Sequence, residues 1–131
     1  MKKNFKKMVV ALLVFSFIFG LAVNKKVSSA YTISERFSVT PLNLARVAIP
    51  NVNEKNDVTV TFTAYPDILP CATQVDIYKN MNFTGSPVTT KVFNRGNHIE
   101  PKFVLPAGKT YYAKISSYTG DDITGTFIAT Y

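Results

Sequence analysis

The amino-acid sequence predicts an all-β protein, an antiparallel β-sandwich of about seven or eight strands in two packed sheets. Apolar and polar residues alternate with a period of two along most of the chain after residue 30. Clusters of Gly, Pro, Asn and Asp separate the alternating runs, which start roughly every 8–14 residues, as in sandwiches and barrels. No long stretch there keeps a helical period without a Pro or Gly, so we expect no substantial helix in this part of the chain.

The clearest strand is Val58–Ala64. Val58, Val60, Phe62 and Ala64 share one face, and the threonines between them share the other, which is typical of a half-buried strand. As an inner strand this segment would be core. At the edge of a sheet, the same uncharged, β-rich segment would pair with another molecule.

The remaining strands show weaker alternation. They are predicted at Thr32–Val39, Thr73–Lys79, Val88–Phe93, Ile99–Leu105, Thr110–Ser116 and Ile123–Tyr131. A further apolar run, Leu42–Ile49, lies between Pro41 and Pro50 and fits either a strand or one short helical turn. Turns are predicted at Asn51–Asp57, Lys79–Pro87, Asn94–Asn97 and Thr119–Asp122.

Residues 1–30 have the three parts of a secretory signal peptide. A lysine-rich head precedes the uncharged apolar run Met8–Val23, and small residues follow at Ser28 and Ala30. The apolar run is shorter than the roughly 20 residues that cross a bilayer as a helix. We therefore expect cleavage between Ala30 and Tyr31 and a secreted, extracellular protein, free or loosely attached to the surface, with no stable membrane insertion. The alternative is a retained N-terminal anchor.

The signal peptide also accounts for the basic charge of the chain. It holds six of the 15 Lys and Arg and none of the eight acidic residues. The mature chain would carry nine basic and eight acidic side chains, a net charge of +1 instead of +7. A basic protein is a candidate for binding nucleic acid, but this mature chain is nearly neutral, so we expect no nucleic-acid partner.

The mature chain, residues 31–131, has the length of a single domain. It holds one cysteine, Cys71, so no disulfide can form within it. The neighbours Pro70 and Ala72 provide no base or positive charge that would stabilise a thiolate. This favours a buried, apolar role for Cys71 over a reactive thiol or a bond between chains.

The C-terminal half resembles the bacterial pre-peptidase C-terminal domain family. The resemblance rests on Leu105–Gly120 with its Ala-Gly turn and paired tyrosines, on the closing strand Gly125–Tyr131, and on Val75–Tyr78 and His98–Leu105 upstream. It implies a jelly-roll-like β-sandwich that assists export or binds polymers such as collagen or polysaccharide. In that family the domain usually follows a secreted protease. Within residues 1–131 the domain is not preceded by a protease, so we expect a role other than a protease appendage, and no acidic cluster matches the calcium sites of some relatives.

The chain has few residues suited to catalysis. His98 is the only histidine, and nothing in the sequence brings it to Cys71 as a nucleophilic dyad. Asp76 and Glu100 are the remaining pair of carboxylates that a glycosidase would need, and we do not assign them that role. We expect no enzyme, no catalytic residue and no cofactor.

Asp121 and Asp122 are weak candidates for calcium ligands. They lie in a turn next to Gly120, and carboxylate oxygens are the ligands that calcium prefers. A solvated turn is the favoured explanation of the pair. We therefore predict no metal site, with these two residues as the place to look.

Tyrosines are the better candidates for binding. If Val75, Ile77 and Tyr111 face the core, then Tyr78 and Tyr112 face outward, and Tyr118 lies near a turn. Exposed tyrosines offer flat contact area with a hydrogen-bonding tip. The alternative is that these rings pack under loops or cover the second face of a sheet.

These observations predict a small secreted, non-catalytic β-sandwich that binds an extracellular polymer, protein or cell-surface partner. The alternatives are a self-assembling extracellular structural subunit and a small secreted effector, such as a toxin or an inhibitor. The ligand and the oligomeric state stay open at this level.

Overall fold

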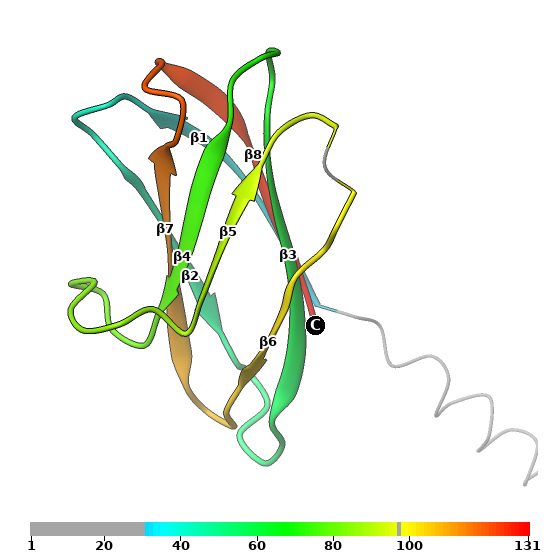
Figure 1. The fold of residues 1–131 in the computed structure, drawn as a ribbon. Helices are drawn as coiled ribbons and strands as arrows, with labels where there is room; N and C mark the ends of the chain where they lie inside the picture. Colours follow the sequence, from blue (N-terminus) through cyan, green and yellow to red (C-terminus); the bar gives the residue numbers. More distant parts are fainter. Residues whose placement is uncertain (1–30, 97) are drawn as a thin grey trace, which may run out of the picture. The chain divides into compact units, whose positions relative to one another are not determined.

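The computed structural model describes residues 31–96 and 98–131, and residues 31–131 form one compact unit (Figure 1). The predicted signal peptide lies outside the described residues. Eight strands follow one another: β1 Thr32–Val39, β2 Ala45–Pro50, β3 Val58–Pro66, β4 Thr73–Tyr78, β5 Thr89–Phe93, β6 Lys102–Leu105, β7 Thr110–Ser117 and β8 Ile123–Thr130. Over these residues no helix is long and apolar enough to cross a membrane.

The strands form two four-stranded antiparallel sheets. The first sheet has the order β1-β8-β3-β6 and the second has the order β2-β7-β4-β5. Only the β4–β5 hairpin connects neighbours within one sheet, and every other connection passes from one sheet to the other. This connectivity is that of a jelly roll. The predicted all-β sandwich is confirmed, and so is the jelly-roll-like fold that the family resemblance implies.

The period-two pattern correctly assigned the inner faces. Val60, Phe62 and Ala64 of β3 are buried in the core. The inward-facing residues of β8, in the same sheet, and of β4 and β7, in the other sheet, belong to the same core cluster. The centre of the core is aromatic: the Phe62 ring lies 5.8 Å from the rings of Phe93 and Phe103, in edge-to-face contacts, and 6.4 Å from that of Phe127. Such contacts join β3 to β5 across the two sheets.

Two alternatives left open by the sequence are decided by strand pairing. The run between Pro41 and Pro50 is a strand, because Ala45–Pro50 pairs with Thr110–Ile115 of β7. Val58–Ala64 is an inner strand, because β3 lies between β8 and β6. The interpretation of Val58–Ala64 as an assembly edge is therefore wrong.

Candidate functional site: an apolar loop end

The structure separates the three tyrosines that the sequence singled out. Tyr78 of β4 and Tyr112 of β7 are partners in the strand register and lie on the outer face of the second sheet. Tyr118 lies just beyond the other end of β7, about 20 Å from Tyr112 at the usual rise of a strand. The three rings therefore do not form one surface.

Tyr78 is not an exposed binding residue. Only 8% of it is accessible, because Phe83 in the β4–β5 loop packs over its ring with centroids 5.3 Å apart. The guanidinium of Arg46 lies 4.8 Å from the Phe83 ring, and the Lys114 ammonium lies 6.0 Å from the Tyr78 ring. The outward direction of Tyr78 was predicted correctly, its exposure was not, and Tyr112 beside it is half-buried.

The residues considered for catalysis lie on different elements of the fold. Asp76 is buried on the outer face of the second sheet, where its carboxylate accepts hydrogen bonds from the Thr90 hydroxyl at 2.7 Å and from the Gln74 amide. Glu100 and His98 are exposed on the β5–β6 loop. These hydrogen bonds satisfy the buried carboxylate of Asp76, so its burial needs no catalytic role to explain it.

A different surface stands out at the end of the sandwich where the β3–β4 and β7–β8 loops meet (Figure 1). Ile68 and Leu69 of the first loop are 67% and 60% exposed, and Tyr118 of the second is 61% exposed. We call these three residues the apolar loop end. Isolated exposed apolar residues are normal, but adjacent large ones more often mark an interaction site.

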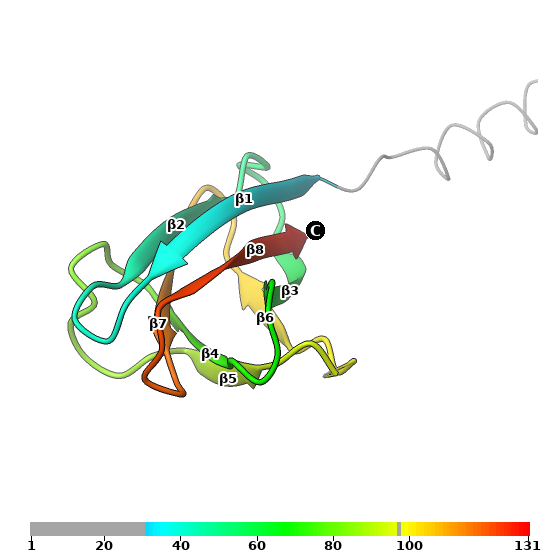
Figure 2. The same cartoon turned by 90° about the horizontal axis from the view of Figure 1, so that it is seen from above.

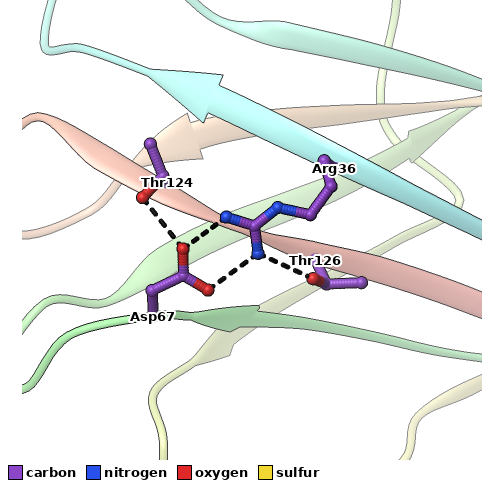
Figure 3. A network of polar contacts seen from close by, with 4 residues as sticks. All are labelled: Arg36, Asp67, Thr124 and Thr126. Carbon is purple, nitrogen blue, oxygen red and sulfur yellow. Dashed lines mark hydrogen bonds and ion pairs between the residues drawn. The ribbon is translucent and has the colours of Figure 1, made fainter.

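One end of the β3–β4 loop is fixed by a polar network on the first sheet (Figure 3). Arg36 of β1 donates two parallel hydrogen bonds to the Asp67 carboxylate, at 2.8 and 2.5 Å, and one to the Thr126 hydroxyl. The Thr124 hydroxyl donates to the same carboxylate at 3.0 Å, and the Asp67 amide donates to the Thr124 carbonyl. This two-pronged arginine contact orients the loop as well as holding it.

The other end of the loop is fixed at Ala72. Its carbonyl accepts a hydrogen bond from the Tyr118 amide at 3.0 Å, and its amide donates to the Thr119 hydroxyl at 3.2 Å. These bonds also tie the β7–β8 loop to the β3–β4 loop. Ile68 and Leu69 are thus presented to solvent from a segment anchored on both sides.

Cys71 lies beside this surface, at a hollow of about 100 Å³ lined by Ser38, Ile68, Cys71, Asp122, Ile123 and Thr124. It is partly exposed, and its thiol lies 3.7 Å from the Asp121 carboxylate. Partial burial and the negative charge of Asp121 raise the pKa of the Cys71 thiol above its ordinary value. The thiol is therefore protonated at neutral pH, which disfavours a role as nucleophile.

Asp121 and Asp122, the candidate calcium ligands, are neighbours in the β7–β8 loop beside this hollow. Asp121 is in contact with the Cys71 thiol, whereas Asp122 lines the hollow. Across the described residues, 31–96 and 98–131, no group of three or more His, Cys, Asp and Glu side chains could hold a metal ion. Calcium usually takes six to eight oxygen ligands.

The pKa of Asp67 provides a direct check of the loop anchor. The hydrogen bonds from Arg36 and Thr124 lower this pKa from 3.8 to about 2. Because the folded-state pKa is depressed, the stabilisation is complete above the ordinary value and is lost as the pH falls through about 2. In Arg36→Gln we expect the pKa of Asp67 to return most of the way to 3.8, as measured by NMR titration of the side-chain carboxyl. An unchanged low pKa would show that Arg36 is not its main partner.

Comparisons with known proteins extend the description only at the level of fold. No family model matches the chain and no curated protein is similar to it, so the resemblance to pre-peptidase C-terminal domains stays a prediction. Among solved structures, one similar chain comes from Bacillus endospore appendages, a family of disulfide-linked pili (TM-score 0.52, 17% identity, 78% of this chain and 83% of that chain). Another is the Yersinia pseudotuberculosis-derived mitogen (TM-score 0.55, 8% identity, 78% of this chain and 85% of that chain). At these identities, what this chain shares with both is a β-sandwich fold.

Proposed function

We propose that this protein is a small extracellular, non-catalytic jelly roll that binds a protein or polymer partner through its apolar loop end. The observation that carries the proposal is the exposure of two adjacent aliphatic side chains, Ile68 and Leu69, on the β3–β4 loop. The exposed Tyr118 lies on the β7–β8 loop, which is hydrogen-bonded to the β3–β4 loop. Burying one such aliphatic side chain against a partner contributes about 1.5–3 kcal/mol. A tyrosine adds contact area and a hydrogen-bonding group at little entropic cost.

The anchoring of the β3–β4 loop supports this proposal. A flexible loop would lose conformational entropy on binding, and this cost subtracts from affinity. Here Asp67 and Ala72 hold the loop at both ends before any partner arrives. The signal-peptide pattern of residues 1–30 supports an extracellular site of action.

Two other functions are compatible with the fold. A similar fold occurs in a chain from disulfide-linked pili, which makes a self-assembling structural subunit the first alternative. Another occurs in a mitogen, which makes a secreted effector the second. All three functions need an exposed contact surface, and they differ in whether the partner is another copy of this chain, an extracellular polymer or a host protein.

The proposal is tested with the mature chain, residues 31–131, and a panel of cell-wall sacculi, collagen, insoluble glycans and intact cells. We expect the wild type to bind at least one member, and Ile68→Ser/Leu69→Ser to weaken that binding about tenfold or more. Val52→Ser is the matched control, because Val52 is 66% exposed on the β2–β3 loop at the other end of the sandwich. Affinity is measured by co-sedimentation or biolayer interferometry.

Two outcomes would contradict binding through the apolar loop end. One is wild-type binding that the double substitution leaves unchanged, and the other is the absence of binding to every member of the panel. Light scattering over a concentration series separates the alternatives. Oligomers that dissociate in Ile68→Ser/Leu69→Ser would favour the structural subunit.

A further inference from the structure

A second surface, independent of the apolar loop end, lies along β1. This strand is at the edge of the first sheet, paired with β8 on one side. Tyr31 and Tyr131 exchange two backbone hydrogen bonds, at 2.6 and 2.9 Å. In an antiparallel ladder, hydrogen-bonded residue pairs alternate with pairs that share no hydrogen bond. Every second residue of β1 therefore has its backbone amide and carbonyl directed away from β8, namely Thr32, Ser34, Arg36 and Ser38.

The edge of the second sheet lies next to this free side (Figure 2). The Asn51 amide bonds to the Lys109 carbonyl, so by the same alternation the backbone groups of Ala48 point away from β7. The neighbouring carbonyl of Pro50 accepts a hydrogen bond from the Tyr131 hydroxyl. Between the two edges runs a groove of about 390 Å³, the β1–β2 groove, lined by Tyr31, Thr32, Ile33, Ser34, Glu35, Ala48 and Pro50.

The groove is lined by both apolar and polar residues, with one acid among them. Ile33 and Glu35 are two residues apart and therefore lie on the same face of β1, the face that looks toward the second sheet. Ile33 packs against the core, whereas Glu35 is exposed. Within residues 31–96 and 98–131 the Arg36–Asp67 contact is the only ion pair, so no described cation neutralises Glu35.

We propose that the β1–β2 groove binds an extended segment of a partner protein, which adds to β1 as a fifth strand of the first sheet. The backbone of this segment forms hydrogen bonds with the free backbone groups of Thr32, Ser34 and Arg36. In complexes formed by strand addition, these main-chain hydrogen bonds provide the affinity. Alternate side chains of the segment enter the groove. Complementarity then specifies a Lys or Arg opposite Glu35 and an apolar residue two positions away, opposite Ile33.

The competing explanation is that Glu35 protects the edge. An inward-pointing charge on an edge strand is one of the ways in which proteins discourage unwanted strand pairing. A protective charge would weaken pairing with any strand. A recognition charge would distinguish between strands by the sign of the residue placed opposite it. The two explanations therefore predict different results for peptides that differ only in that residue.

The test uses the mature chain and synthetic blocked heptapeptides. The probe is acetyl-Thr-Thr-Val-Thr-Lys-Thr-Thr-amide, and its matched control has Glu in place of Lys. Binding is followed through amide chemical shifts in two-dimensional NMR. We expect shifts at Thr32, Ser34 and Ala48, and binding of the Lys peptide about fivefold or more tighter than that of the Glu peptide. In Glu35→Gln this preference is expected to fall to near onefold.

Ser34→Pro tests the strand addition itself. Proline removes the backbone donor that points away from β8, so the existing ladder keeps its bonds and edge strands tolerate the residue. We expect the variant to fold and to lose peptide binding. Ile68→Ser/Leu69→Ser should bind the Lys peptide as the wild type does, which separates this proposal from the apolar loop end.

Three results of the peptide experiments would overturn the proposal. They are the absence of binding to folded wild type at millimolar peptide, equal binding of the Lys and Glu peptides, and unchanged binding by a folded Ser34→Pro protein. Concentration-dependent shifts along β1 without any peptide would also overturn it, because they would assign the edge to pairing between two copies of this chain.

Discussion

Gly125→Ala is expected to destabilise the sandwich by about 3 kcal/mol or more, the upper range for overpacking a core. Gly125 is a buried residue of β8, opposite Phe37 of β1 on one side and Pro66 of β3 on the other. A Cβ at this position would lie 2.3 Å from the Tyr65 carbonyl oxygen and 2.5 Å from Cζ of Phe37. The Tyr65 oxygen belongs to the backbone and cannot rotate away, so β8 would have to move away from β3.

The measurement is thermal unfolding followed by circular dichroism. For a domain of this size we expect the melting temperature to fall by roughly 12–24 °C. Gly96→Ala is the matched control, because its added Cβ would meet only the Asn94 side chain, at an ordinary 3.5 Å. We expect the control to stay within about 0.5 kcal/mol of wild type. If both variants have the same melting temperature, β1 and β3 do not approach Gly125 of β8 as closely as the structure shows.

Asn51→Leu is expected to have the next largest effect, about 3 kcal/mol. Asn51 is a buried polar residue that directly follows β2. The β2–β3 loop, which it begins, lies at the end of the sandwich opposite the apolar loop end (Figure 1). Its amide nitrogen donates to the carbonyls of Asn56, Leu105 and Pro106 at 3.0–3.2 Å, and its oxygen accepts from the Asn53 amide. A leucine would fill similar space but leave these backbone groups without a partner, at a cost of about 1–3 kcal/mol for each buried one.

Asn51→Asp provides the matched variant, because its stability should depend on pH in a defined direction. An ionised carboxylate cannot donate a hydrogen bond to any of these carbonyl oxygens, whereas a protonated one can donate a single hydrogen bond to one of them. The folded-state pKa should therefore lie above the unfolded value of about 3.9. The stabilising hydrogen bond is then present below that value and lost as the pH rises through the folded-state pKa. We expect Asn51→Asp to be more stable than Asn51→Leu at pH 3 and no more stable at pH 7. A difference that does not change with pH would contradict donation by Asn51.

The strands were predictable because alternation is a local property. Thr32–Val39 was predicted with the bounds that β1 has, and Val58–Ala64 and Thr110–Ser116 lie within β3 and β7. The run between Pro41 and Pro50 was ambiguous, because its apolar residues fit two periods over so short a length. Its pairing with β7 decided the matter, and that pairing joins residues sixty or more positions apart.

The candidate site was only partly predictable. Tyr118 was found because a tyrosine near a turn is visible in the sequence. Tyr78 was assigned to the correct face, but the packing of Phe83 over its ring depends on how the β4–β5 loop folds back. Ile68 and Leu69 were missed, although two aliphatic residues between Asp67 and Pro70 are unusual for a loop and could have been noticed.

The sequence by itself determined the fold class of the molecule, the absence of a disulfide within residues 31–131, and the inner faces of the period-two strands. These features depend on each residue and its near neighbours. The export signal stays a prediction. Only the tertiary structure decided that β3 is an inner strand, that Tyr78 is covered, and that β1 and β2 present free edges to one groove. The physical reason is that exposure and strand order depend on contacts between segments far apart in the chain, and the alternation within one strand carries no information about which strand will lie beside it.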